Sequence, residues 1–203
     1  LVGGGSGVAV PGEVSLAHRG TLFLDEMAEF PRANLDTLRQ PLEAGRVTVA
    51  RRGITASFPA SFHLVAATNP CPCGYLNDRR RPCQCRPAEV ARYRQRLSGP
   101  LLDRFDLVVK VDRLEAGVLG TKTETSQSVR QRVANARRVL DATPPEMTPI
   151  CQSLLAAALS DALLTARGVA RVSRVAETIA ALSGEDRVDE RHIAEAMALR
   201  GEW

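Results

Sequence analysis

The stretch "TLFLDEMAEF", residues 21–30, begins with an apolar run and then places two carboxylates side by side. Thr21 to Leu24 has the length and composition of a buried strand, and Asp25 and Glu26 follow at the point where that strand would end. In an open α/β sheet, ligands gather where the strands end at their carboxyl side. This stretch therefore predicts a buried strand that leads into a ligand-binding edge, with a solvated turn at the strand end as the alternative interpretation.

Two further stretches have the same apolar character, Phe62 to Thr68 ("FHLVAAT") and Asp106 to Val111 ("DLVVKV"). Asn69 directly follows the first of them, and a helix is expected between the strands from Arg32 to Ala44, ended by Gly45. Short apolar runs of this kind suit a parallel sheet that is covered on both faces. The alternation of strands and helices predicts an α/β fold.

A hairpin is predicted between those strands, in "RVTVARRGITASF", residues 46–58. Val47 and Val49 alternate with polar neighbours, and a turn is expected near Arg52-Gly53. Its tip carries Arg51 and Arg52, which are candidates for salt-sensitive, sequence-independent contacts to the phosphates of DNA. A solvated hairpin without a ligand is the alternative interpretation.

The second half of the sequence has a different pattern. Residues 113–125 form a polar connector, and after it the periodicity predicts helices with no strand between them, at Ser126–Leu140, Pro149–Leu164, Arg167–Ser183 and Asp189–Arg200. We therefore expect three parts: an α/β domain over residues 1–112 with a cysteine-rich insertion at 70–86, a linker over 113–125, and a small all-helical domain over 126–203.

The composition excludes several classes of protein. Apolar residues make up 44% of the 203 residues, which is enough for a folded core. Because no run approaches roughly 18 consecutive apolar residues, we expect no membrane partner and a cytoplasmic location. The net charge is +4, and almost all of the basic residues are arginines, since Lys110 and Lys122 are the only lysines. The sequence begins with Leu1 and shows no signal peptide, so we interpret it as a piece of a longer protein.

Four cysteines form the pattern C-x-C-x9-C-x-C, as Cys71, Cys73, Cys83 and Cys85. Four thiolates from two short pairs can complete a tetrahedral zinc site, and a cytosolic protein would rarely oxidise them to disulfides. The spacing within each pair is shorter than the common C-x₂-C knuckle. A structural zinc site is therefore the favoured interpretation, with a redox-active or unligated cluster as the alternative.

Several motifs together carry a resemblance to a known family. The run that includes "GTLFLDE", "LDTLRQPLEAGRVTVAR", "VAATNPCPCGY" and "RYRQRLSGPLLDRFDL" resembles, essentially end to end, the magnesium-chelatase-like AAA+ ATPases of the YifB/ComM type. The likeness continues through "ARGVARVSRVAETIAALSG" in the helical part. The resemblance implies a partial P-loop NTPase core followed by a helical lid, with ATP and Mg²⁺ as cofactors.

The resemblance also implies roles for five residues. Asp25 and Glu26 would be the Walker B pair, with Asp25 on Mg²⁺ and Glu26 as general base, and Asn69 would be sensor 1. Arg104 would be an arginine finger that reaches into the next subunit, and Arg167 would be sensor 2 and contact the nucleotide. From the residues alone, Arg104 can equally pair with Asp103 or Asp106, and Arg167 can belong to a solvated helix face.

One departure from the family pattern is large. A P-loop of the form G-x-x-x-x-G-K-[ST] is absent, because no lysine follows the glycines near the start of the sequence. In the family the P-loop lies upstream of the segment that begins here. We therefore expect this chain to be a C-terminal fragment that lacks Walker A and does not hydrolyse ATP by itself.

The family implies that the intact protein is a ring-forming motor, a hexamer that acts on DNA as a helicase or branch-migration enzyme linked to competence. One alternative is the motor subunit of a true magnesium chelatase. A second alternative is a non-enzymatic interaction domain that is stabilised by zinc. The upstream sequence would distinguish a motor from such a domain.

Overall fold

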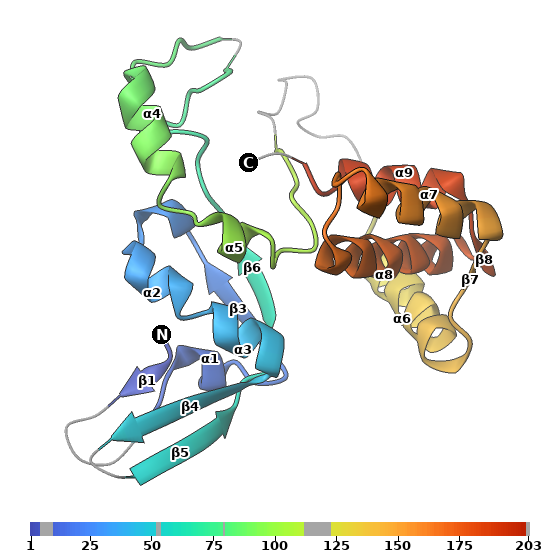
Figure 1. The fold of residues 1–203 in the computed structure, drawn as a ribbon, viewed down its shortest axis with the longest axis horizontal. Helices are drawn as coiled ribbons and strands as arrows, with labels where there is room; N and C mark the ends of the chain where they lie inside the picture. The colour runs from blue at the N-terminus through green and yellow to red at the C-terminus, as the bar shows by residue number, and fades with distance from the viewer. Residues whose placement is uncertain (5–9, 52–53, 79, 112–122, 202–203) are drawn as a thin grey trace. The chain divides into compact units, whose positions relative to one another are not determined.

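The computed structural model describes residues 1–4, 10–51, 54–78, 80–111 and 123–201. The chain divides into two compact units, Leu1–Phe105 and Asp106–Glu202, which are described one at a time (Figure 1). The first is a mixed α/β unit with small sheets and short helices, consistent with part of an AAA+ core. The domain boundaries proposed from the sequence stay a prediction, because residues 112–122 lie outside the described residues.

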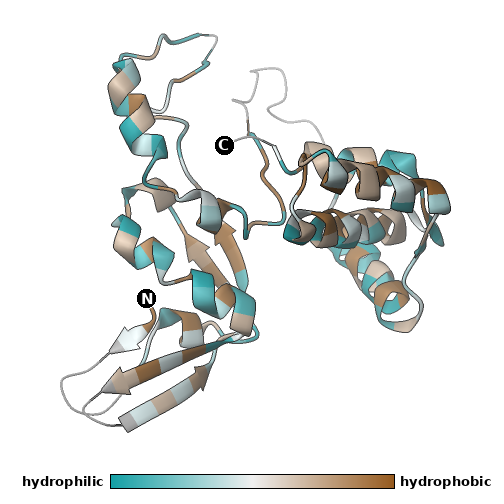
Figure 2. Ribbon diagram, viewed as in Figure 1, coloured by the Kyte–Doolittle hydropathy of each residue, from teal (hydrophilic) through white to brown (hydrophobic). Residues whose placement is uncertain are grey.

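A two-stranded parallel sheet is the centre of the first unit, where β3 (Thr21–Leu24) pairs with β6 (His63–Ala66). Leu22 lies opposite Leu64 in the register, and Leu24 lies opposite Ala66. These side chains face a core that also contains Val14, Leu35, Leu38 and Leu101. Apolar residues predominate along both strands in Figure 2. The two strands expected from apolar runs are therefore present and parallel.

The opposite face of this sheet is open within the described residues. Phe23 and Val65 are partners in the register, and their exposed fractions are 57% and 48%. The sequence predicted a sheet that is covered on both faces. The structure corrects that expectation, because the first unit supplies packing partners for one face only.

The helix predicted from Arg32 to Ala44 is two helices, α2 (Arg32–Asp36) and α3 (Arg39–Ala44). The break has a local cause at Pro41, which has no N–H to donate to the carbonyl of Thr37 and whose ring crowds that carbonyl. Gly45 ends α3 in the left-handed conformation with φ of 63°, as the sequence predicted.

The predicted hairpin is formed by β4 (Arg46–Arg51) and β5 (Ile54–Pro59), which pair antiparallel over six rungs from Arg46↔Pro59 to Arg51↔Ile54. The turn at residues 52–53 lies outside the described residues. The remaining elements of this unit are short: β1 (Gly3–Gly4), β2 (Val10–Pro11), α1 (Glu13–Leu16), η1 (Met27–Glu29), α4 (Pro87–Arg94) and α5 (Gly99–Leu102).

Four longer helices make up most of the second unit: α6 (Ser126–Ala142), α7 (Pro149–Ser160), α8 (Ala166–Ser183) and α9 (Glu190–Ala198). The core forms around α8, where Val172, Ala176 and Ala180 are fully buried. Apolar and polar residues alternate along α8 in Figure 2, as expected for a helix with one buried face. All four predicted helices are therefore present.

The expectation of an all-helical second domain is not confirmed, because this unit also contains a parallel pair of short strands. In it β7 (Glu146–Met147) pairs with β8 (Arg187–Val188). The pair connects the segment before α7 to the segment before α9. Strands of two residues are too short to produce a readable alternation, so the sequence pattern gave no sign of them.

The third predicted strand, Asp106 to Val111, is also corrected, since no strand or helix is present at residues 106–111. Val109 and Val111 are 65% and 90% exposed, and the N–H of Val108 donates to the carbonyl of Leu199 at 2.6 Å. A strand requires a neighbouring strand to pair with its backbone groups, and here the connection is to the end of α9 instead. None of the described helices is long and apolar enough to cross a bilayer.

Candidate functional site

The carboxyl ends of β3 and β6 lie at the same edge of the sheet, and each is followed by a residue that the sequence singled out. The parallel ladder continues past both strands, since the N–H of Ala67 donates to Leu24 and the N–H of Met27 donates to Ala67. Asp25 and Glu26 follow β3, and Asn69 follows β6. All three side chains are exposed to solvent. The fold therefore brings the predicted acids and amide to one accessible edge.

Glu26 has a strained backbone at this edge. Its φ of 49° and ψ of 44° place it in the left-handed region, which costs a residue other than glycine about 1–2 kcal/mol. The Asp25 carboxylate accepts a hydrogen bond from the Glu26 N–H at 2.9 Å. Strain of this kind is concentrated at functional sites in proteins. Two neighbouring carboxylates thus follow this turn, and carboxylate oxygens are the ligand type that Mg²⁺ prefers.

Arg104, the predicted arginine finger, is held inside the first unit. Its side chain is 7% exposed and its guanidinium forms an ion pair with Glu43 at 2.5 Å. It also donates to the carbonyl of Pro100, while its Nε has no hydrogen-bond partner among the described residues. Glu43 lies on α3 and was not among the partners considered from the sequence. Asp106, one of those partners, pairs with Arg171 at 3.5 Å instead.

Arg104 and Glu43 line a hollow of ≈ 690 Å³ in the first unit. Residues of α2, α3 and β4, including Asp36, Arg39 and Val49, complete its wall. The guanidinium is therefore next to an open space, although most of its surface is covered.

The three arginines at helical spacing on α8 have different surroundings. Arg167 is exposed in the first turn, where the sequence expected the nucleotide contact. Arg171 is 8% exposed and Arg174 lies 3.9 Å from Asp106, so both arginines approach the same carboxylate. The buried Arg171 does not belong to the solvated helix face that was the alternative interpretation for Arg167. Adjacent residues of a helix do not share a face, so the neighbouring core residue Val172 gave no signal of this burial.

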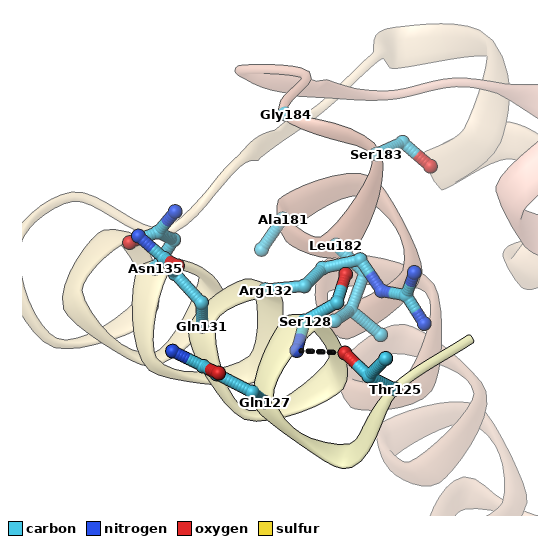
Figure 3. Close-up of a pocket in the computed structure, with 10 residues that line it drawn as sticks. All are labelled: Thr125, Gln127, Ser128, Gln131, Arg132, Asn135, Ala181, Leu182, Ser183 and Gly184. Atoms are coloured by element: carbon cyan, nitrogen blue, oxygen red, sulfur yellow. Dashed lines mark hydrogen bonds between the residues drawn. The ribbon is translucent and has the colours of Figure 1, made fainter.

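A second hollow, of ≈ 580 Å³, lies between α6 and the end of α8 (Figure 3). Its walls are mainly polar and include Gln131, Arg132 and Ser183. At a rise of about 1.5 Å per residue, Leu182 lies about 22 Å along the helix from Arg167. This groove is therefore remote from the arginine predicted to contact the nucleotide.

The sulfur atoms of the four predicted zinc ligands converge. Cys71 lies 3.5 Å from Cys73 and 3.7 Å from Cys83, and Cys73 lies 3.5 Å from Cys83. All four sulfurs, including that of Cys85, lie within 4.8 Å of one another. All four cysteines are unpaired, and Cys71 is fully buried. The structure thus brings together two pairs that are separated by nine residues in the sequence.

The thiols of this cluster differ in pKa. Backbone N–H groups, first that of Tyr75 and then that of Gln84, lower the pKa of Cys73 to about 6. Burial raises the pKa of Cys85 to about 12. For Cys83 the N–H of Cys85 lowers the pKa, but burial and the neighbouring thiols outweigh it and the net change is upward. The thiolate form is therefore favoured at Cys73 and disfavoured at Cys83 and Cys85.

The loop between the two cysteine pairs is held by its own side chains. Asp78 accepts hydrogen bonds from the N–H groups of Arg80 and Arg81 at 2.8 and 2.9 Å. The guanidinium of Arg81 lies 4.4 Å from the ring centre of Tyr75 and donates to its hydroxyl. Gly74 has a φ of 78°, and a side chain there would lie 3.7 Å from Oδ1 of Asn69. The cysteine loop therefore packs directly against the amide at the sheet edge.

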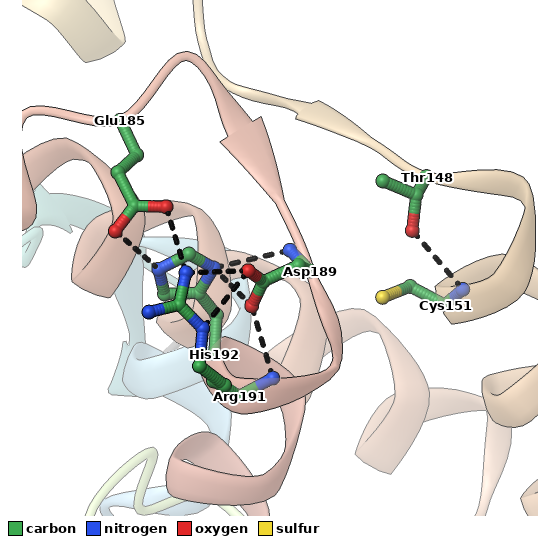
Figure 4. Close-up of polar contacts among 6 residues, drawn as sticks. All are labelled: Thr148, Cys151, Glu185, Asp189, Arg191 and His192. Carbon is green, nitrogen blue, oxygen red and sulfur yellow. Dashed lines mark hydrogen bonds and ion pairs between the residues drawn. The ribbon is translucent and has the colours of Figure 1, made fainter.

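A second group of potential metal ligands, Glu185, Asp189 and His192, is explained by helix capping (Figure 4). The Asp189 carboxylate accepts from the N–H of Arg191 at 3.0 Å, and the Asp189 N–H donates to Nδ1 of His192 at 3.1 Å. The guanidinium of Arg191 also binds the carboxylates of Asp189 and Glu185, at 2.6 and 3.1 Å. A cation would have to displace the guanidinium of Arg191. We therefore interpret these side chains as the cap at the start of α9 and not as a metal site.

Of the two arginines predicted to contact DNA, the structure describes only the backbone of Arg51. Arg51 is the last residue of β4, and its side chain lies outside the described residues, as does the whole of Arg52. The β4–β5 hairpin that would carry these arginines is formed. Their role stays a prediction.

The class of protein follows from the comparison with family models. The chain belongs to the family described as magnesium chelatase, subunit ChlI, whose model matches residues 1–119. A model for the C-terminal part of the same subunit matches residues 140–200. The resemblance to magnesium-chelatase-like AAA+ ATPases is therefore confirmed over both units.

Among individual relatives, the chain is similar to the competence protein ComM of Haemophilus influenzae, with 40% identity over 98% of this chain and 42% of that protein. It is 38% identical to the uncharacterised protein YifB of Escherichia coli over 98% of this chain and 42% of YifB. The chloroplastic magnesium-chelatase subunit ChlI of rice is more distant, at 26% identity over 91% of this chain and 43% of the subunit. The chain thus spans about two-fifths of the length of the curated relatives it matches.

Proposed function

We propose that this chain is part of a Mg²⁺-dependent ATPase motor that assembles into a homo-oligomeric ring, a hexamer, and acts on DNA in the cytoplasm. The observation that supports the ATPase most strongly is the edge of the β3–β6 sheet, where Asp25 and Glu26 follow one strand and Asn69 follows the other. The backbone strain at Glu26 is of the kind found at functional sites, and the Asp25 carboxylate accepts the Glu26 N–H there. Membership of the magnesium-chelatase family supports the same chemistry for the intact protein.

Each residue at this edge has a distinct role in the proposal. Asp25 would hold Mg²⁺, which neutralises charge on the phosphates when it is bound. Glu26 accepts a proton from the attacking water as general base, and Asn69 orients that water through its amide. Residues that bind the triphosphate itself are missing from the sequence, so we propose that this chain does not hydrolyse ATP without the rest of the protein.

Two arginines complete the proposed site. Arg104 acts across a subunit interface and stabilises charge on the transferring phosphoryl group of the neighbouring nucleotide. Glu43, its partner in the first unit, would keep its contact with the guanidinium and orient the remaining N–H groups toward phosphate oxygens when subunits assemble. Arg167 contacts the nucleotide from the first turn of α8, where it is exposed.

The proposal that the substrate is DNA rests on the hairpin tip and on a relative. Arg51 and Arg52 would contact the phosphates of a strand that passes through the ring, giving helicase or branch-migration activity. The similarity to a protein named for competence supports a DNA substrate. The composition, with 4% aromatic residues, favours backbone contacts over base stacking.

The test of this function uses the full-length protein that contains this segment. We expect Mg²⁺-dependent ATP hydrolysis that DNA stimulates, and DNA binding that weakens with salt. Replacing both Arg51 and Arg52 by Ala should reduce the slope of log K against log[salt] by about 2, because two phosphate contacts are lost. ATP hydrolysis without any response to DNA would reject the DNA substrate while leaving the ATPase in place.

The chief rival is the motor subunit of a magnesium chelatase, which the 26% identity to the rice subunit favours. Co-purification with a porphyrin-inserting partner, together with failure to bind DNA, would select that rival. The other alternative is a non-enzymatic interaction domain that is stabilised by zinc. A full-length protein that does not bind ATP would favour this alternative. The cluster of four cysteines does not by itself select one of the three functions.

A further inference from the structure

We propose that Cys71, Cys73, Cys83 and Cys85 bind one structural Zn²⁺ ion as four thiolates, and that this ion fixes the loop that packs against Asn69. The proposal does not depend on ATP hydrolysis. It concerns a metal site that is separate from the proposed Mg²⁺ site at Asp25.

The spacing of the sulfurs fits a single tetrahedral ion. Zn–S bonds of about 2.3 Å in tetrahedral geometry place the sulfurs about 3.8 Å from one another. Cys71, Cys73 and Cys83 have mutual sulfur distances of 3.5 to 3.7 Å, and the sulfur of Cys85 joins them within 4.8 Å. The four sulfurs therefore already surround a point at which one ion fits.

The same distances argue against the other uses of four cysteines. Disulfide sulfurs lie about 2.05 Å apart, and none of the measured separations approaches this value. An iron–sulfur cluster contains several metal ions and sulfides between its cysteines, so it needs a wider ring of thiolates than this one. Tetrahedral coordination by four sulfurs is characteristic of structural zinc.

Backbone N–H groups point at the sulfurs, as the charge of such a site requires. Zn²⁺ with four thiolates carries a net charge of about −2, which hydrogen-bond donors around the ligands stabilise. The N–H groups of Tyr75 and Gln84 reach Cys73, that of Cys85 reaches Cys83, and that of Cys73 reaches Cys85. The contact from the N–H of Cys85 to Cys83 lies within one C-x-C pair, and the contact from the N–H of Cys73 to Cys85 joins the two pairs.

The site is joined to the sheet edge by a short and buried connection. Cys71 lies two residues after Asn69 and is fully buried, and the N–H of Gly74 donates to its carbonyl at 3.0 Å. That turn brings Gly74 against the Asn69 amide. A metal ion that holds Cys71 and Cys73 therefore restrains the residues on which Asn69 rests.

The first experiment measures metal content. Protein purified from zinc-supplemented medium should contain one zinc per chain by mass spectrometric elemental analysis, and the double variant Cys83→Ser/Cys85→Ser should contain none. Cys151→Ser is the matched control and should keep its zinc, since Cys151 is a buried core residue on α7. Exchange for Co²⁺ should produce the strong visible absorption of a tetrahedral tetrathiolate complex.

A titration of the wild-type protein covers the case in which the double variant does not fold. A mercurial reagent should release one zinc, detected with a chromogenic chelator, as four thiols are modified. On zinc removal, hydrogen exchange should accelerate in residues 67–76 and stay unchanged in α7 and α9.

Three results would overturn the proposal: no zinc in protein whose four thiols are free and reduced, stoichiometric iron in place of zinc, or full zinc retention by the double variant. Unchanged exchange at residues 67–76 after zinc release would overturn the link to Asn69. The readouts are zinc content and hydrogen exchange, neither of which requires ATP hydrolysis. Failure of the proposed ATPase function would therefore leave this test unaffected.

Discussion

The helices of the two units begin in different ways. In the second unit every one of the four long helices has a side-chain cap, in which Thr125, Thr148, Thr165 or Asp189 accepts a backbone N–H from the first turn. In the first unit α1, α2, α3 and α5 begin without a side-chain cap bond. The second unit is therefore specified by local interactions, whereas the first depends on packing around its sheet.

Most residues of the candidate site lie in the first unit. The first unit contains the left-handed Glu26, the open carboxylates at the sheet edge and the covered Arg104. We infer that changes to these residues affect turnover far more than folding, and that changes to the caps of the second unit do the reverse. The experiments below use the full-length protein and are ordered by the size of the expected effect.

Replacing Arg104 with Ala is expected to have the largest effect, a loss of about 10³-fold or more in ATP turnover, the range for arginine fingers in other systems. Stability should change little, because its partner Glu43 is partly exposed and can be hydrated. Mixing this variant with Glu26→Gln subunits should restore part of the hydrolysis, since each variant supplies what the other lacks at a shared interface. No recovery at any mixing ratio would reject action across subunits.

Replacing Glu26 with Gln should lower turnover by about 10²-fold or more, as expected when a general base is removed, while ATP binding is retained. The glutamine keeps the size of the side chain and the backbone conformation, so thermal unfolding should not change. Turnover and nucleotide affinity are measured on the same preparation. A variant that turns over ATP at the normal rate would remove Glu26 from the mechanism.

Replacing Glu43 with Gln tests whether this residue positions Arg104. Loss of a charge-assisted contact of about 1 kcal/mol predicts a decrease in turnover of about fivefold to tenfold, smaller than that of Arg104→Ala. The loss should be complemented by Glu26→Gln subunits in the same way. Glu195→Gln, at an exposed position on α9, is the matched control and should turn over normally. An equal decrease in both variants would mean that Glu43 has no specific role.

In the second unit, replacing Thr148 with Ala should lower the free energy of unfolding by about 1 kcal/mol through loss of the α7 cap. Thr148→Ser keeps a hydroxyl at the cap and should retain most of the stability. Chemical denaturation measures the free energy, and turnover at low temperature should be normal for both. A turnover loss comparable to that of Glu26→Gln would contradict the division between the units.

The smallest effect concerns acid pH. Hydrogen bonds from Arg191 lower the pKa of Asp189 below its ordinary value of about 3.9. Stability from this carboxylate is therefore present above that ordinary value and is lost as the pH falls through the lowered pKa. Asp189→Asn keeps the cap acceptor but does not titrate, so its melting temperature should fall less steeply below about pH 4. Parallel curves for the two proteins would show that Asp189 contributes nothing to acid sensitivity.

The division also explains how much of the fold was predictable. Caps and stops such as Asp189 and Gly184 are encoded within a few residues, so the sequence located α6 to α9 to within a few residues of their ends. The break between α2 and α3 was encoded at Pro41 but overlooked. Residues 106–111 have the composition of a strand without forming one, because pairing depends on a neighbouring strand and not on composition.

The candidate site was predictable where a local sequence pattern marks each of its parts. The spacing of the cysteines predicted their cluster, and the apolar runs of β3 and β6 predicted the edge that carries Asp25 and Asn69. Glu43 and Arg104 are 61 residues apart, and no local pattern connects them. Burial of Arg171 beside Asp106 depends in the same way on packing between distant segments. Contacts of this type need the folded structure.

The open face of the β3–β6 sheet has a practical consequence for laboratory work on this chain. Phe23 and Val65 present adjacent apolar side chains to water, and contiguous apolar surface promotes association between copies. Preparations of the 203-residue chain should consequently sediment faster, and scatter more light, as their concentration rises. Purification at low concentration, with a solubilising fusion partner, is the appropriate starting point.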